Sequence, residues 1–170
     1  TSSRPNAPRS IDMISRAEML LWKLVTAQFR LGAHSCHGPS HWMTVLRNGL
    51  YLARHHEVDE EVVRLFALFH DSCREDEGRD PLHGPRGAEL ALEFRQAGHF
   101  QLEDERMDLL VTACRIHNGG PVQTESTLGV CLDADRLDLG RVGILPAARH
   151  LSTSTARDIA QRQAWLELQP

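Results

Sequence analysis

The sequence predicts an all-α protein that folds as a single-domain helical bundle. Segments of helix length carry apolar residues at spacings of three and four, and glycine or proline separates one segment from the next. No segment alternates apolar and polar residues with the two-residue period of a strand. The 170 residues suit one domain, which we expect over residues 11–170, after a flexible leader at residues 1–10.

Residues that favour helix ends mark the first three elements. Ser10 is expected to cap the first helix, and Gly32 to end it. Ser40 and Asp59 stand where they would cap the next two helices. These three helices are predicted at residues 11–31, 41–55 and 60–71.

The second half of the chain follows the same pattern after a polar, acidic connection. Gly98 ends the fourth helix, a Gly-Gly-Pro run closes the fifth, and Gly140 and Gly143 break the sixth. Pro146 begins a short helix before the last long one. The long helices of this half are predicted at residues 83–96, 103–117, 126–139 and 154–168.

The composition is that of a soluble protein with a small negative charge. Hydrophobic residues make up 41% and charged residues 25% of the chain, and the net charge is -4. We therefore expect no stable nucleic-acid complex and no membrane association. Lys23 is the only lysine, so arginine supplies the other positive charges. Arginine suits phosphate binding, although genome base composition explains the same bias.

The cysteines indicate a reducing compartment. No two of the four cysteines form a Cys-x-x-Cys pair, which argues against a zinc-ribbon site. Cys114 and Cys131 lie in apolar helical segments, where we expect buried thiols. The chain shows no signal-peptide pattern and no apolar run near the roughly 20 residues of a membrane span. We expect a cytoplasmic protein.

Polar side chains stand at positions where the helices predict core residues. In the sixth predicted helix, Leu128, Leu132, Asp135 and Leu139 lie on one face, so a carboxylate interrupts an apolar stripe. The same holds for imidazoles in three other helices, namely His41 with Val45, His70 with Val63 and Phe66, and His117 with Leu110.

A shared cation would satisfy these buried polar groups together. A buried carboxylate is costly unless opposite charge or hydrogen bonds compensate it, and imidazole and carboxylate both bind divalent metals. The alternative is that each of these side chains is satisfied separately by local hydrogen bonds.

The order His41, then His70-Asp71, then Asp135 resembles the HD superfamily of metal-dependent phosphohydrolases. His70-Asp71 closes an apolar helix, and Asp135 stands in an Ala-Asp-Arg-Leu segment similar to the motif of the last ligand in that superfamily. The resemblance spans about residues 40–143. It implies an HD-type helical bundle in which these four residues bind one divalent cation, with Asp133 as the rival of Asp135.

Some members of the superfamily bind a second metal through two further histidines. His83 and His117 fit those places, and the resemblance then implies that Asp71 bridges the two ions. The alternative is that both histidines only cap helix ends. The metal is expected to be Mn, Fe, Zn, Mg, Ni or Co, with one ion bound and a second left open by the sequence.

The resemblance implies hydrolysis of a nucleotide or other small phosphate ester by metal-activated water. Asp71 is expected to be catalytic. Arg74 is expected to take part in catalysis and to bind the phosphate, with Arg86 as a second substrate-binding arginine. His37 is expected to line the mouth of the pocket.

Glu75 and Asp76 are the candidates for general acid and base. The (p)ppGpp hydrolases of the superfamily carry a Glu-Asp pair shortly after the His-Asp doublet, but here the pair comes one residue later. That departure argues against (p)ppGpp as the specific substrate. The acidic run is also compatible with a solvated loop.

Two other functions remain open at this point. One is a di-iron oxygenase of the HD type, and the other is a non-catalytic module that binds a metal or a nucleotide. A homodimer is a further expectation, because apolar residues near Trp165 and Leu168 would pair two chains if they were exposed.

Overall fold

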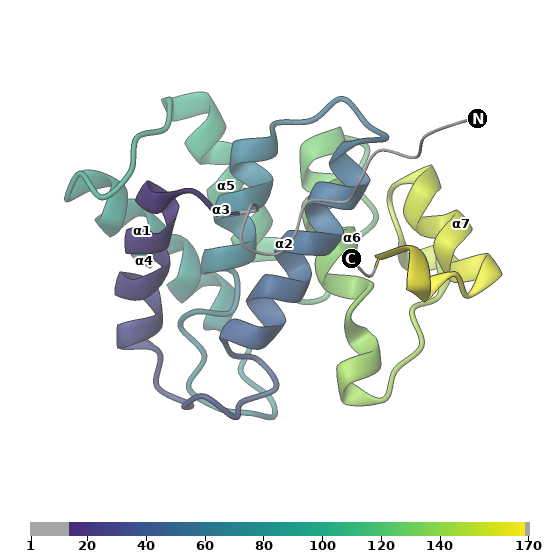
Figure 1. The fold of residues 1–170 in the computed structure, drawn as a ribbon, viewed down its shortest axis with the longest axis horizontal. Coiled ribbons are helices and arrows are strands. Elements are labelled where there is room, and N and C mark those ends of the chain that lie inside the picture. Colours follow the sequence, from purple (N-terminus) through teal and green to yellow (C-terminus); the bar gives the residue numbers. More distant parts are fainter. Residues whose placement is uncertain (1–13, 169–170) are drawn as a thin grey trace.

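The structure is a computed structural model that describes residues 14–168, and these residues form helices without any strand (Figure 1). The predicted all-α class is therefore confirmed. The α-helices are α1 (Arg16–Gln28), α2 (Pro39–Ala53), α3 (Glu60–Phe69), α4 (His83–Gln96), α5 (Asp104–Ile116), α6 (Ser126–Arg136) and α7 (Ser154–Arg162). The 3-10 helices are η2 (Leu139–Val142), η3 (Ala148–His150) and η4 (Trp165–Leu168).

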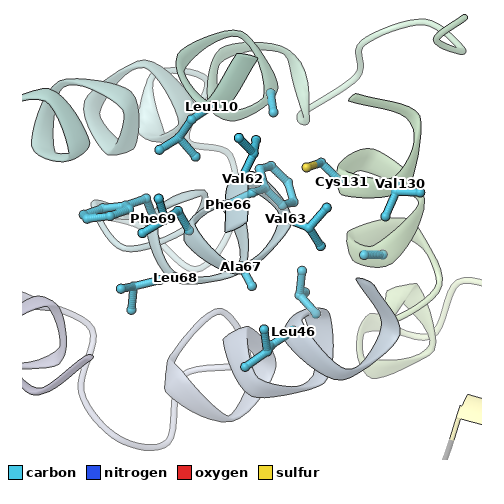
Figure 2. Packing of buried hydrophobic residues seen from close by; sticks show 14 of the residues in the cluster. Leu46, Val62, Val63, Phe66, Ala67, Leu68, Phe69, Leu110, Val130 and Cys131 are labelled. Atoms are coloured by element: carbon cyan, nitrogen blue, oxygen red, sulfur yellow. The ribbon is translucent and has the colours of Figure 1, made fainter. Parts of the chain in front are cut away.

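Helix α3 is the centre of the bundle. Asp59 caps it as predicted, because its side chain accepts a hydrogen bond from the amide of Val62. The helix packs against α1, α2, α4, α5 and α6. Figure 2 shows Phe66 among the buried side chains that these helices contribute, which include Leu46 of α2, Leu110 of α5 and Cys131 of α6. The last five residues of the helix, from Leu65 to Phe69, are all apolar and buried, and His70 and Asp71 follow them directly.

The ends of the first two helices differ from the prediction. Ser15, rather than Ser10, caps α1, and it forms a capping box with Glu18. Ser10 and the leader at residues 1–10 lie outside the described residues. Helix α2 begins at Pro39 after the N-cap Gly38, so the expectation that Ser40 caps it is wrong. Proline is favourable at the first position of a helix because that position needs no amide donor.

The C-terminal part of the chain is more broken than predicted. Helix α6 ends at Arg136, and a 3-10 turn replaces its predicted last turn. The predicted last helix divides at Gln163, whose φ of 52° ends α7 before η4 begins. In Figure 1 this part of the chain, in light green and yellow, runs from α6 to α7 at one edge of the bundle.

Three further expectations concern burial. Cys114 and Cys131 are buried free thiols, as predicted. Of the apolar residues expected to be exposed near the C-terminal end, Leu168 is buried and Trp165 packs against the core, but Leu166 between them is 79% exposed. The homodimer stays a prediction. None of the helices at residues 14–168 combines the length and apolar composition of a membrane span.

Candidate metal centre

Five helices bring six polar side chains to one place in the interior. His41 lies in the first turn of α2, and Asp135 in the last turn of α6. His70 and Asp71 follow the end of α3. The other two are at helix ends, since His83 begins α4 and His117 is the C-cap of α5. All six residues are buried, with exposed fractions between 0% and 9%.

Two glycines of α4 allow these helix ends to meet. A Cβ atom at Gly84 would collide with the carbonyl oxygen of Cys114, and one at Gly87 with that of Phe69. The two glycines are one turn apart, so one edge of α4 lies directly against the ends of α5 and α3. This close approach brings His83 to the ends that carry His117 and Asp71.

In His41 and His70, the ring nitrogen that points away from the cluster, Nδ1, is hydrogen-bonded to an acceptor. Nδ1 of His41 donates to Oδ2 of Asp138 at 2.7 Å, and Nδ1 of His70 donates to the carbonyls of Phe66 and Ala67 at 3.1 Å. A carbonyl or a carboxylate oxygen cannot donate, so the proton is on Nδ1 in each ring. Nε2 of each ring therefore points inward, and in the neutral imidazole it carries a lone pair.

His83 and His117 follow the same rule. Nδ1 of His83 donates to the carbonyl of Asp80, and Nδ1 of His117 donates to that of Cys114 at 2.8 Å. The Nε2 atoms of these two rings are 2.8 Å apart, and those of His41 and His70 are 3.0 Å apart. Two lone pairs repel at these distances, so each pair of rings needs a proton or a cation between its nitrogens.

Asp71 joins the two pairs of imidazoles through its two oxygens. Oδ1 lies 3.1 Å from Nε2 of His83 and 3.4 Å from Nε2 of His117. Oδ2 lies 3.6 Å from Nε2 of His41 and 3.9 Å from Nε2 of His70. The potential ligand atoms thus form two groups, each within 4.8 Å, and Asp71 belongs to both. A carboxylate shared in this way is the arrangement of a two-metal site.

Asp135 supports the fit of a cation most directly. Its Oδ1 atom is buried and has no hydrogen-bond partner among residues 14–168, although it lies 3.2 Å from Nε2 of His41. The rival carboxylate, Asp133, accepts hydrogen bonds from the amides of Ser152 and Thr153 and from the hydroxyl of Thr153. Of the two carboxylates, Asp135 faces the imidazoles, and its oxygen lacks the compensation that a buried charge requires.

The pKa shifts describe a site that exchanges protons for a cation. Burial lowers the pKa of His70 to about 3, so its ring is neutral and able to bind a metal. Burial by itself raises the pKa of the Asp71 carboxyl, but the surrounding imidazoles outweigh burial and hold that pKa well below its usual range. The pKa of Asp135 is lowered against burial in the same way, chiefly by contact with His41.

His41 and His117 are shifted in the opposite direction from His70. Burial lowers the pKa of His41, but its contacts with Asp135 and Asp138 outweigh burial and raise the pKa above its ordinary value. The pKa of His117 is raised against burial by its contact with Asp71. A proton on Nε2 thus stabilises the carboxylates where a cation would, and metal binding must release that proton.

Comparison with known proteins matches residues 40–140 to the HD domain, which is more than half of the chain. The chain belongs to the HD domain family. The match covers all six of these buried polar residues, five of them before α6 and Asp135 in its last turn. No curated protein matches the chain.

The fold of this HD domain is also found in a solved structure. The crystal structure of a predicted HD superfamily hydrolase from an uncultured Thermotogales bacterium is similar, with a TM-score of 0.71 and 24% sequence identity. The similarity covers 94% of this chain and 92% of the other. At this identity the likeness shows the HD-type fold, and it confirms the fold that the sequence resemblance implied.

A cavity of about 630 Å³ opens beside the candidate ligands of the HD domain. Asp71, His83, His117 and Asp135 line it, whereas His41 and His70 lie behind them. A cavity of this size accommodates a small organic ligand. The ligand cluster is therefore reachable through this cavity.

Arg74 and His37 line the cavity, and the roles expected for them in substrate binding and catalysis stay predictions. Nε of Arg74 donates to Oδ1 of Asp71 at 3.3 Å, and its terminal nitrogen donates to the carbonyls of Asp76 and Gly78. Nδ1 of His37 lies 3.1 Å from Oδ2 of Asp71. Both side chains are buried and line the cavity beside Asp71.

Three other predicted residues are turned to other partners. Arg86 donates to Oδ2 of Asp80 at 2.5 Å and to the carbonyl of Cys73. Glu75 forms an ion pair with Arg30, and the carboxylate of Asp76 accepts from the amide of Gly78. Arg86, Glu75 and Asp76 are not among the residues that line the cavity. Their predicted roles find no support in this geometry.

Arg141 and Asp138 belong to the site but were missed by sequence reasoning. Nε of Arg141 donates to the carbonyl of Cys36 and its Nη1 to that of Asp138, which fixes the guanidinium. Its Nη2 lies 3.9 Å from Oδ1 of Asp135 and 4.0 Å from Oδ2 of Asp71. Both positions follow the end of α6 at Arg136, and no helical spacing relates Arg141 to the ligands.

Proposed function

We propose that this HD domain is a metal-dependent phosphohydrolase that acts on a nucleotide or another small phosphate ester. The observation that carries the proposal is the convergence of four inward Nε2 atoms on two carboxylates, one of which has a buried oxygen without a hydrogen-bond partner. Local hydrogen bonds satisfy the outward side of each imidazole but leave the inward side uncompensated. A cation compensates all six side chains together.

The residues divide into ligands for one or two ions. His41, His70, Asp71 and Asp135 would hold the first cation, and His83 and His117 would hold a second with Asp71. Mn, Fe, Zn, Mg, Ni and Co all accept such nitrogen and oxygen ligands. When bound, the cation supplies a Lewis acid that polarises a phosphoryl oxygen and lowers the pKa of water toward neutrality.

The side chains around the ligands have separate tasks in this proposal. Nε and Nη1 of Arg141 are bound to carbonyls, and Nη2 lies 3.5 Å from Nδ1 of His37. In this proposal Nη2, which is also within 4.0 Å of the carboxylates of Asp71 and Asp135, turns to donate to a phosphoryl oxygen. Arg74 is committed to Asp71 and to the backbone, so it positions the carboxylate and adds positive charge at the cavity. His37 lines the cavity beside Asp71, where it would contact the substrate.

Elemental analysis paired with a panel of phosphate esters tests the proposal. The purified protein is assayed with nucleotides, sugar phosphates and alkyl phosphates in the presence of each of the six cations. We expect bound metal and release of phosphate or pyrophosphate in the wild type. Asp71→Ala should lose both bound metal and activity, because Asp71 contacts both groups of imidazoles.

The control is Asp158→Ala, which removes an exposed carboxylate of α7 that pairs with Arg162 outside the cavity. This variant should keep both metal and activity. Full retention of metal by Asp71→Ala would overturn the assigned site. Two bound irons with oxygen consumption and no hydrolysis of any ester would replace the proposal by the oxygenase.

A further inference from the structure

The cavity of the HD domain is lined by two kinds of side chain, which we name the polar wall and the apolar wall. The polar wall consists of the candidate ligands that line the cavity and of other polar residues, which are His37, Arg74, Asn118, Arg136, Arg141, Arg149 and His150. Eight large hydrophobic side chains are exposed in residues 14–168, and four of them line this one cavity. Chance exposure would spread these side chains over the surface, so their concentration here points to a binding surface. The four residues are Val122, Val142, Ile144 and Leu145.

The apolar wall belongs to two connections that are tied together from α6. Val122 lies between α5 and α6, and the other three residues lie between α6 and η3. Arg136, next to the candidate ligand Asp135, donates to the carbonyls of Gly120 and His150 and so bridges the two connections. Helix α6, which supplies the candidate ligand Asp135, therefore also holds the apolar wall beside the candidate metal centre.

The lining lacks the large aromatic rings that most often hold a nucleobase, although His150 and Arg149 are present. The lining contains no phenylalanine, tyrosine or tryptophan on which a base would stack. Asn118 is its one amide side chain. Leu145 and Ile144, in contrast, are 72% and 53% exposed, and a ligand that covers them removes apolar surface from water.

We propose that the cavity binds the organic group of an apolar phosphate monoester, such as an alkyl phosphate, against the wall of Val122, Val142, Ile144 and Leu145. The inference rests on the proposed phosphohydrolase function and narrows its substrate. An amphiphilic ester matches both walls, because its phosphate faces the cationic end at Arg141 while its chain covers the apolar end. A nucleotide leaves the apolar wall largely exposed or unmatched.

Chain length is the quantity that tests this subsite. The n-alkyl phosphates from ethyl to octyl share one head group, and each added methylene covers more of the wall. We expect kcat/KM to rise about fourfold for each methylene until the wall is covered. Octyl phosphate should exceed every nucleoside monophosphate of the panel in kcat/KM. The matching alkyl phosphonates, which are not hydrolysed, should show the same trend in affinity by calorimetry.

Two variants separate the wall from the metal centre. Leu145→Ser should flatten the dependence of kcat/KM on chain length and lower kcat/KM for octyl phosphate, while the bound metal stays at the wild-type content. Leu166→Ser is the matched control, because Leu166 is 79% exposed and does not line the cavity. Leu166→Ser should keep the wild-type dependence of kcat/KM on chain length.

A rate independent of chain length, or a preference for a nucleoside monophosphate over octyl phosphate, would overturn the inference and leave the phosphohydrolase intact. Failure to hydrolyse any ester with any cation would overturn the proposed function instead. In that case the binding of alkyl phosphonates still tests the apolar subsite. Affinity that grows with chain length supports the subsite, and failure of the phosphonates to bind overturns it.

Discussion

The contact between Asp138 and His41 leads to a prediction that separates ligand positioning from folding. Oδ2 of Asp138 accepts the Nδ1 proton of His41 at 2.7 Å, which orients Nε2 toward Asp71 and Asp135. In Asp138→Asn the side chain keeps its shape but loses its charge. Carboxylates in this position strengthen a histidine ligand, and their loss typically costs 10-fold to 100-fold in metal affinity.

The structure places the expected loss at the low end of that range. The Asp138 side chain is 20% exposed, so water partly screens the attraction between its charge and His41. Nη1 of Arg141 lies 3.9 Å from the same oxygen and already offsets part of that charge. We therefore expect about a tenfold weaker metal affinity, which corresponds to about 1.4 kcal/mol. His41 remains in place because the helix around it is unchanged.

Competition with a chromophoric chelator measures the affinity of the metal-free protein for Zn²⁺ or Mn²⁺. Urea unfolding of the metal-free protein measures stability separately. Asp158→Asn is the matched control, since it makes the same chemical change at an exposed carboxylate far from the cavity lining. An unchanged metal affinity in Asp138→Asn would refute the positioning role. The role would also be refuted if the free energy of unfolding of the metal-free protein fell by as much as the free energy of metal binding.

Three further predictions concern the framework of the site. Asp133→Asn should keep the wild-type metal content but lower the free energy of unfolding by about 1–3 kcal/mol, because it weakens the hydrogen bonds that hold residues 152–153. Loss of metal in elemental analysis would restore Asp133 as a ligand. Gly87→Ala should cost about 1–3 kcal/mol in urea unfolding because its Cβ meets the carbonyl of Phe69, whereas Gly140→Ala, where a Cβ meets open space, should cost little. Asp59→Asn should cost about 0.5–1 kcal/mol at neutral pH, because asparagine caps a helix as well as aspartate does and only the charged contact with Arg106 is lost. Hydrogen bonding from Arg106 is the largest cause that lowers the pKa of Asp59 from its ordinary 3.8, so its stabilisation is present above that pH and disappears as pH falls through the folded pKa. The difference in urea midpoint between wild type and Asp59→Asn should therefore shrink in acid, and a constant difference would contradict the charge-based account.

Periodicity identified most of the ligands because helical spacing decides which face is buried. His70 follows a helix in which every residue from Leu65 to Phe69 is buried, so its own burial was predictable. Asp135 interrupts an apolar stripe, and the structure buries that stripe in α6. Such arguments use neighbours along the chain, and they hold wherever the helix docks by its apolar face.

The partners of the arginines were not predictable in the same way. Arg86 is one turn from His83, yet its guanidinium extends to Asp80, and Arg141 reaches the ligands from a connection without periodic structure. The bounds of α2 likewise depended on Pro39, whose effect on the helix start outweighed the capping tendency of Ser40. A long polar side chain has several acceptors within reach, and only the packed chain selects among them.

The amino-acid sequence alone determined the all-α class, the approximate helices and the set of imidazoles and carboxylates that must be buried, since each depends on contacts within one or two helical turns. Tertiary structure decided that these side chains share one centre, that Asp71 joins both groups and that Arg141 and an apolar wall complete the cavity. Those features depend on distances between helices, which the glycines of α4 and the packing around α3 set, and local sequence does not encode such distances.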